Sequence, residues 1–146
     1  MSQDLFTYEH EVRVTYCLTN AEGNVDHDQY ARLFAVTREL FGLDFIPRFK
    51  EEAGLLYLLK TRNASYEYRK DFVFGDVMKI RLWMKELTYA SFALAAEFVN
   101  SLTDKVHATG QQQIVYTDLT GKPRRIPEDL RKLIAGAMKP AKDMNE

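Results

Sequence analysis

The chain has 146 residues, of which 46% are hydrophobic and 12% aromatic, and this is enough to build the core of one domain. Its formal net charge is −1 and its pI is near 6.3. These values argue against nucleic acid as a main partner, because binding to a phosphate backbone normally needs a clear basic excess. We expect one globular domain over residues 1–138 and a frayed tail over 139–146.

The lone cysteine and the hydropathy pattern bear on the compartment. Cys17 has no second cysteine to pair with, and no motif surrounds it, which favours a small packed thiol over a nucleophile. The chain starts without the basic and apolar segments of a secretion signal. No apolar run approaches the ~20 residues that cross a membrane. These features predict a soluble, cytoplasmic protein without a membrane partner.

The first predicted element is a half-buried antiparallel strand over Phe6–Leu18. Ring-bearing and aliphatic residues alternate with polar residues along this stretch. The face expected to be buried carries Phe6, Tyr8, His10, Val12, Val14, Tyr16 and Leu18.

A long helix is predicted to begin after Asp26. Asp26 is a suitable N-cap, and Gln29 stands where its side chain can reach back to the Asp26 amide. Val25 and Tyr30 occupy the two positions of a hydrophobic staple. The backbone N–H groups of the first turn, starting with His27, then point outward at the positive end of the helix dipole. Such a helix start suits a developing oxyanion.

One stripe of this helix is expected to be buried, because its apolar residues recur at helical spacing. The stripe consists of Tyr30, Leu33, Phe34, Thr37 and Phe41. Gly42 is expected to end the helix. Arg38 borders the stripe, and from its spacing alone it is either a solvated arginine or a functional one.

The rest of the chain predicts mostly strands. Leu43–Glu52 has no period and indicates a loop or a short helical turn, and Gly54–Arg69, apolar on both faces at its start, indicates a central strand. Val106–Asp118 is a further strand, unusually polar at its three consecutive glutamines, and Pro127 is expected to open a short helix. Two more strands are expected to face inward through Met78, Ile80, Leu82 and Met84, and through Ala90, Phe92, Leu94, Ala96 and Phe98. This order is α+β.

The segment before the helix also carries a family resemblance. Asn20–Tyr30 reads NAEGNVDHDQY and resembles the D-x-x-G-x-V-x-H-x-x-Y segment of hotdog-fold acyl-CoA thioesterases, the 4-hydroxybenzoyl-CoA thioesterase and YbgC-like group. Gly23, Val25, His27 and Tyr30 match, whereas Asn20 replaces the aspartate of most of that family.

A smaller, asparagine-bearing branch is more similar. The thioesterases of enediyne polyketide biosynthesis share Thr19-Asn20 and Gly23-Asn24-Val25, and they resemble this chain again at Arg38-Glu39-Leu40-Phe41. In that branch the asparagine orients a water and the arginine stabilises negative charge.

The resemblance implies a hotdog fold, with a five- to six-stranded antiparallel sheet wrapped around one long helix and no cofactor. It implies hydrolysis of acyl-CoA or acyl-carrier-protein thioesters by a homodimer or homotetramer whose sheets pair edge to edge, with active sites at the interface. The catalytic residues implied are Asn20, His27 through its backbone N–H, and Arg38. The implied substrate-binding residues are Gly23, Asn24, Val25, Asp26 and Tyr30.

Coenzyme A carries phosphates, so a basic group should border the site. Arg69 and Lys70 are one candidate cluster, and Lys122, Arg124 and Arg125 are another. A run of charges is also the ordinary pattern of a solvated face, so these assignments stay open.

No metal site is expected. His10, His27 and His107 are scattered along the chain. The side chains of Asp26-His27-Asp28 splay around a helix and do not converge on one point.

Three functions remain open at this stage. The first is a thioesterase that uses a positioned water, since Asn20 cannot accept a proton and only Asp26 or Asp28 could replace the base. The second is an inactive hotdog protein that binds acyl thioesters or serves as an assembly partner. The third and weakest is a hotdog dehydratase, which needs a histidine facing a carboxylate.

Overall fold

The computed structural model describes residues 6–51 and 58–138, so the predicted tail and the apolar start of the predicted 54–69 strand lie outside it. Its elements are β1 (Tyr8–Arg13), the 3-10 turn η1 (Tyr16–Leu18), α1 (His27–Phe45), α2 (Arg48–Glu51), β2 (Leu59–Tyr68), β3 (Val77–Leu87), β4 (Ser91–Asn100), β5 (Lys105–Tyr116) and α3 (Glu128–Ala137). No helix among these residues is long and apolar enough to cross a membrane.

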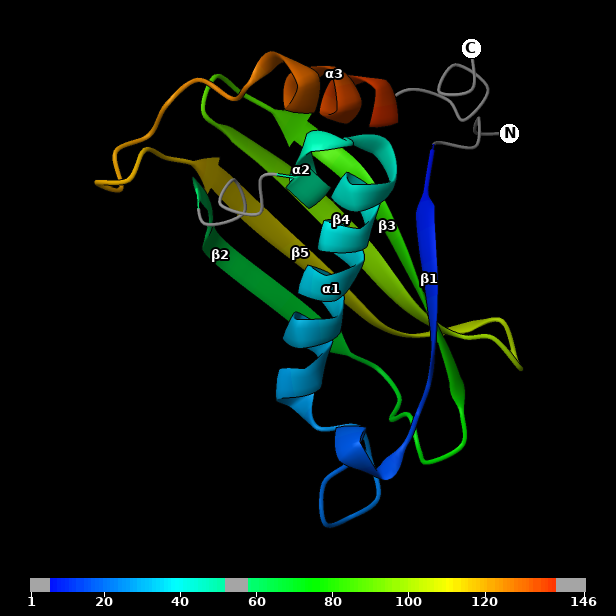
Figure 1. The fold of residues 1–146 in the computed structure, drawn as a ribbon. Coiled ribbons are helices and arrows are strands. Elements are labelled where there is room, and N and C mark those ends of the chain that lie inside the picture. Colours follow the sequence, from blue (N-terminus) through cyan, green and yellow to red (C-terminus); the bar gives the residue numbers. More distant parts are fainter. Residues whose placement is uncertain (1–5, 52–57, 139–146) are drawn as a thin grey trace.

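The five strands form one antiparallel sheet in the order β1-β3-β4-β5-β2, and α1 lies across one face of it (Figure 1). The two short helices, α2 and α3, lie at the end of the sheet where α1 finishes. The predicted α+β order is therefore confirmed, with five strands in the described part of the chain.

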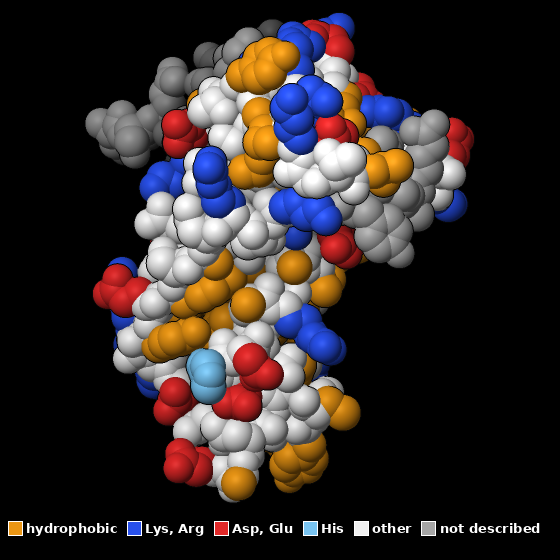
Figure 2. All heavy atoms as spheres, turned by 90° about the vertical axis from the view of Figure 1, so that its left-hand side faces the viewer, with side chains coloured by type: hydrophobic (Ala, Val, Ile, Leu, Met, Phe, Trp, Pro, Cys, Tyr) orange, Lys and Arg blue, Asp and Glu red, His pale blue; other side chains and the backbone are white. Residues whose placement is uncertain are grey.

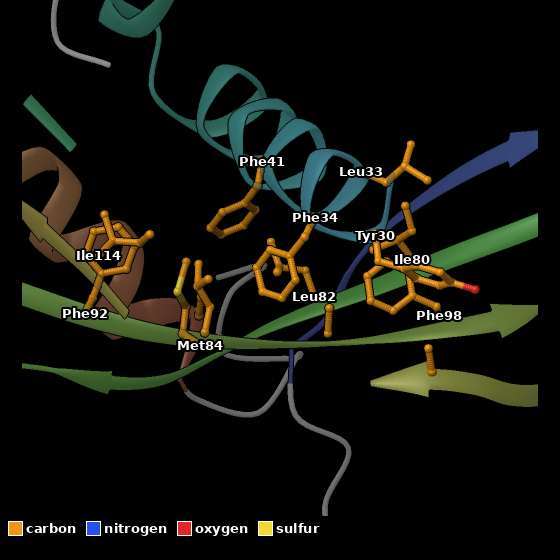
Figure 3. Packing of buried hydrophobic residues seen from close by; sticks show 14 of the residues in the cluster. Tyr30, Leu33, Phe34, Phe41, Ile80, Leu82, Met84, Phe92, Phe98 and Ile114 are labelled. Atoms are coloured by element: carbon orange, nitrogen blue, oxygen red, sulfur yellow. The ribbon is translucent and has the colours of Figure 1, made fainter. Parts of the chain in front are cut away.

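The predicted stripe of α1 is confirmed, because all five of its residues are buried. Figure 3 shows Tyr30, Phe34 and Phe41 pointing from α1 toward sheet residues such as Leu82. Burying each such ring contributes about 1.5–3 kcal/mol relative to leaving it exposed. This contact fixes both the position and the direction of α1 on the sheet.

A glycine lets the helix lie close to the sheet. A Cβ atom on Gly110 of β5 would lie 2.8 Å from the Tyr66 ring and 3.3 Å from the Phe34 ring. A larger residue at this position would push one of these two rings aside. Gly110 therefore makes room for Tyr66 of β2 beneath α1.

The first strand is shorter than predicted. β1 ends at Arg13, which pairs with Val77 at the start of β3, so the residues beyond it have no strand to pair with. Val14 still bonds to the turn before β3, through Val14 N–H to the Asp76 carbonyl at 2.8 Å. Tyr16 is 72% exposed instead of buried.

Gly42 does not end α1, which continues to Phe45. Gly42 is buried within the helix, and a Cβ atom there would lie 2.5 Å from the ring of Phe49 in α2. The role of Gly42 is close packing. The helix ends at Phe45, because Pro47 disfavours a helical backbone at the residue before it, Ile46.

β2 is an edge strand, which corrects the prediction of a central one. It pairs with β5 only, and most of its described residues are exposed. The apolar run that suggested a central strand spans residues 55–59, of which 55–57 lie outside the described part. At the other end of the chain, Pro127 is the N-cap of α3 and not its first residue.

His107 occupies a β-bulge in β5. Val106 pairs with Val99 and Ala108 pairs with Phe98, which leaves His107 as the extra residue. Its side chain is 2% exposed against the Phe72 ring, and neither ring nitrogen has a hydrogen-bond partner among the described residues. Burial, with help from the nearby charge of Lys70, lowers the pKa of His107, while Asp76 and Asp71 act in the opposite direction.

This arrangement predicts a loss of stability in mild acid. Below about pH 6.5 an unfolded histidine binds a proton that folded His107 resists, so the free energy of unfolding should fall as pH decreases from about 6.5, by at most about 1.4 kcal/mol per pH unit. His107→Leu should reduce this dependence, as measured by urea unfolding between pH 5 and 7. His27→Gln, at an exposed histidine, is the matched control. An unchanged slope in His107→Leu would rule His107 out as its source.

Candidate active site

The loop before α1 is a tight turn that Asn20 holds together. Asn20 N–H donates to the Asn24 carbonyl at 2.8 Å, and Gly23 N–H donates to the Asn20 carbonyl at 3.0 Å. Gly23 has a φ of 86°, a conformation that favours glycine. The side-chain oxygen of Asn20 accepts from Glu22 N–H at 2.9 Å and from Asn24 N–H at 3.4 Å. The amide of Asn20 thus shapes the turn from which it projects.

The segment after β2 anchors this turn to the sheet. Val25 N–H donates to the Phe72 carbonyl at 2.9 Å, and Asn24 forms a β-bridge with Val73. Asp26 N–H donates to the Leu18 carbonyl at 3.0 Å. The predicted reach of the Gln29 side chain back to that amide is therefore wrong.

Asp26 is the N-cap of α1, as predicted. Its carboxylate accepts the backbone N–H of His27 at 3.1 Å. The same carboxylate lies 3.4 Å from His27 Nδ1, in an exposed position. The N–H group expected to bind a thioester oxygen thus already binds a negatively charged oxygen.

Tyr68 joins the start of α1 to the end of β2. Its hydroxyl donates to the His27 carbonyl at 3.3 Å, and its ring lies 5.0 Å from that of Tyr30. Burial, with a smaller effect of Asp71, raises the pKa of Tyr30 to about 12. The sequence alone did not indicate Tyr68 as a site residue, because its contact with α1 depends on how β2 lies against the helix.

Arg69 and Lys70 follow Tyr68 directly, so the structure places them close to the start of α1. Both are exposed, and their backbone N–H groups donate to the His107 carbonyl at 2.8 and 3.0 Å. The second basic cluster follows β5, whose end at Tyr116 pairs with Leu59 at the opposite end of β2. In that cluster Arg124 pairs with Asp118, and Arg125 with Glu128.

The residues from Asn20 to Tyr30 therefore gather at one end of α1, the lower end in Figure 1. Figure 2 shows the face of the molecule on the β2 side. Hydrophobic side chains form a band across its middle, a histidine and acidic side chains lie below the band, and Lys and Arg side chains lie above and beside it.

Arg38 is not part of this end. At 1.5 Å per residue it lies about 16 Å along α1 from His27. Its Nη1 donates to Oε1 of Gln112 on β5, and lies 3.5 Å from Oγ1 of Thr61 on β2. Burial lowers the pKa of Arg38, and within residues 6–51 and 58–138 it forms no ion pair with a carboxylate.

A small apolar cavity adjoins Arg38. Its volume is about 30 Å³, and it lies between α1, α2, α3 and the sheet. Its lining includes Arg38, Phe41, Gly42, Phe49, Met84 and Leu133. A wider hollow of about 510 Å³ lies over β2–β5 around Trp83, Ala95 and Gln111, and it contains none of the predicted site residues.

No metal-binding cluster of His, Cys, Asp or Glu occurs among the residues that the structure describes. The free Cys17 is exposed, not packed as its sequence context favoured.

Solved structures share this fold. A hypothetical protein from Staphylococcus aureus, solved in complex with CoA, is similar with a TM-score of 0.83 at 18% identity, over 96% of this chain and 89% of that one. The dynemicin thioesterase, studied with a bound polyene, is similar with a TM-score of 0.77 at 24% identity, over 88% and 95%. A 1,4-dihydroxy-2-naphthoyl-CoA thioesterase from Synechocystis is similar with a TM-score of 0.79 at 16% identity, over 88% and 96%.

The sequence itself matches a family over most of its length. Residues 12–134 match the family described as the thioesterase-like superfamily, whereas no curated protein matches the chain significantly. The resemblance seen at Asn20–Tyr30 is thereby confirmed at the level of the family and the hotdog fold. This chain belongs to the thioesterase-like superfamily.

Proposed function

We propose that this protein hydrolyses acyl thioesters of coenzyme A or of a carrier protein with a water positioned by Asn20. The general class, a thioesterase on a hotdog fold, follows from the family. The observation that supports the finer proposal is the turn of Asn20 set against the N-terminus of α1, where an anionic oxygen already occupies the His27 N–H.

The reaction adds water to the carbonyl carbon of the thioester. The C–S bond then breaks, the thiol leaves with a proton, and the acid is released as a carboxylate with a second proton lost to solvent. The transition state carries negative charge on the carbonyl oxygen, and the enzyme must stabilise it.

In this proposal the backbone N–H of His27 binds that oxygen. The Asp26 carboxylate oxygen, 3.1 Å from His27 N, occupies the position that the oxyanion would take. Both are anionic acceptors at the positive end of a helix dipole. Asp26 must therefore turn its side chain away when substrate binds.

Asn20 would hold the attacking water through its side-chain oxygen. That oxygen keeps a 2.9 Å bond from Glu22 N–H, which maintains the turn. The bond from Asn24 N–H is longer, at 3.4 Å, and a water can replace it. An amide orients the water but does not remove its proton.

Arg38 would reach this site from a second copy of the chain. Two contacts show that α1 runs alongside β2, with His27 near Tyr68 and Arg38 near Thr61. β2 is an exposed edge strand beside an apolar band, the kind of edge that pairs with another chain (Figure 2). Antiparallel pairing of two β2 strands would set the Thr61 end of one copy beside the Tyr68 end of the other.

The remaining parts of the substrate fit the same arrangement. Arg69 and Lys70, exposed beside the start of α1, would bind coenzyme A phosphates. The apolar cavity beside Arg38 would accept the end of the acyl group. At about 30 Å³ it holds little more than a water, so longer acyl chains require Phe49 or Leu133 to move.

One pair of observations favours the alternative, a protein that binds acyl thioesters without hydrolysing them. The Asn20 side-chain oxygen and the His27 N–H are both engaged by groups of the same loop. If these bonds persist with substrate bound, no water is oriented and no oxyanion is stabilised.

Substitutions at Asn20 and Arg38 separate these functions. Asn20→Ala and Arg38→Ala should each lower kcat for acyl-CoA by roughly 10- to 1000-fold, the range for losing one positioning or oxyanion group. Asn20→Asp should retain or increase hydrolysis, because the carboxylate keeps the acceptor for Glu22 N–H and adds a base. Arg32→Ala, at an exposed arginine of α1, is the control for Arg38. If wild type, Asn20→Ala and Arg38→Ala hydrolyse acyl-CoA at equal rates, Asn20 and Arg38 are not part of the active site.

Mixing two inactive variants tests whether the site is shared between copies. If Asn20 of one copy works with Arg38 of the other, a mixed dimer of Asn20→Ala and Arg38→Ala chains has one intact site. An equal mixture after subunit exchange should regain about a quarter of wild-type activity, since half of the dimers are mixed and half of their sites are intact. A mixture that stays as inactive as its components, with mixed dimers verified by mass spectrometry, would place both residues of a site in one chain.

A further inference from the structure

We infer that Gln112 is a positioning residue that holds the Arg38 guanidinium in place without neutralising its charge. This inference rests on the proposed function, in which Arg38 stabilises negative charge at the thioester.

Gln112 is the only one of the three consecutive glutamines in β5 whose side chain bonds to α1. It is 4% exposed, and its Oε1 accepts a hydrogen bond from Arg38 Nη1. Gln111 instead accepts from Lys85 Nζ at 2.8 Å, and Gln113 accepts from Asn63 Nδ2 at 2.9 Å. Alternation along the strand therefore sets Gln112 apart from two otherwise identical neighbours.

Tyr66 fixes the orientation of the Gln112 amide. The Nε2 group of Gln112 donates to the Tyr66 hydroxyl at 2.8 Å, so Oε1 is the atom that faces Arg38. The Tyr66 ring is itself held between Gly110 and Phe34 in the contact of α1 with the sheet. Burial raises the pKa of Tyr66, which keeps its hydroxyl neutral. The orientation of Arg38 is thus set by the packed core.

The charge of Arg38 is left uncompensated by these partners. Gln112 and Thr61 offer only neutral oxygens, and no carboxylate forms an ion pair with Arg38 in the described part of the chain. The adjacent Glu39, which is exposed, stabilises the charge of Arg38 without contacting it as an ion pair and only partly offsets the effect of burial on the Arg38 pKa. A desolvated cation is usually paired with an acid, because leaving it unpaired is costly. A glutamate at position 112 would have the same length and would supply that pair. The amide preserves a positive charge for an anion that arrives from outside.

The surroundings strengthen the effect of this charge. Arg38 adjoins the apolar cavity lined by Phe41, Met84 and Leu133, where little water screens it. An oxyanion, or the carboxylate of the released acid, interacts more strongly with a cation in such a place than in bulk water. Gln112 would keep the guanidinium aimed without competing for that interaction.

Substitutions at Gln112 test this role against matched changes at Gln111. Gln112→Met removes both hydrogen bonds and should lower kcat for acyl-CoA by roughly 10- to 100-fold with a smaller change in KM, because the lost interaction belongs to the transition state. Gln112→Glu should lower kcat similarly at pH 8 by pairing with Arg38. Gln111→Met and Gln111→Glu should leave kcat within about 2-fold, since Gln111 lies outside the proposed site.

The pH profile separates positioning from a structural role. In Gln112→Glu, activity relative to wild type should rise as pH decreases, because protonation of the new carboxylate restores a neutral partner for Arg38. Its midpoint of thermal unfolding should not be lower than that of wild type, since the pair is satisfied. A Gln112→Glu profile parallel to wild type at every pH, or an unchanged kcat in Gln112→Met, would overturn the inference.

Binding of decanoate, a simple carboxylate probe, keeps this test independent of turnover. Calorimetry at pH 8 should show binding to wild type and Gln111→Glu, and at least 10-fold weaker binding to Gln112→Glu. If wild type hydrolyses no thioester but decanoate binding still depends on Gln112, the proposed hydrolysis fails and the role of Gln112 stands. If decanoate binds all three proteins equally, the inference about Gln112 is overturned.

Discussion

The burial of one side of α1 against the sheet is the interaction on which the rest of the structure depends. Tyr30 and Phe41, near the two ends of the buried stripe, are both in the core cluster, so the helix has no freedom to slide or rotate. The Asn20 turn is connected to the start of this helix, and Arg38 projects from the helix at a position between the buried residues Phe34 and Phe41. Packing of purely apolar groups therefore determines where the polar groups of the site lie.

This constraint also explains why one chain does not complete the proposed site. Arg38 and His27 are separated by about 16 Å of a straight, packed helix, and no side-chain movement closes that distance. The exposed edge of β2 runs antiparallel to the same helix, with Tyr68 beside His27 and Thr61 beside Arg38. A two-fold axis through that edge exchanges the two ends, which is how a rigid helix can place both groups in one site.

Local sequence signals were sufficient to predict most helices and strands and part of the site. They could not predict the contacts between elements that are distant in the sequence. The helical period predicted the buried stripe, and the capping preference of Asp26 predicted where α1 begins. The position of β2 at the edge depends on strand order, which no local pattern contains. Tyr68 and Gln112 were missed as site residues for the same reason, because their contacts with α1 arise only from the register of β2 and β5. Resemblance supplied Asn20 and Arg38.

The amides at Asn20 and Gln112 have a common physical explanation within the proposed site. Each stands where a carboxylate of nearly the same shape would fit. Gln112 bonds to Arg38 of its own chain, and Asn20 would face Arg38 of the other copy in a dimer paired through β2. A carboxylate at either position would form an ion pair with the guanidinium and reduce the charge available to a developing oxyanion, but at position 20 it would also supply a base that offsets this loss. Amides keep the hydrogen bonds and leave that charge free. The cost is the absence of a strong base, so such a site must rely on the orientation of its water and on electrostatic stabilisation of the oxyanion.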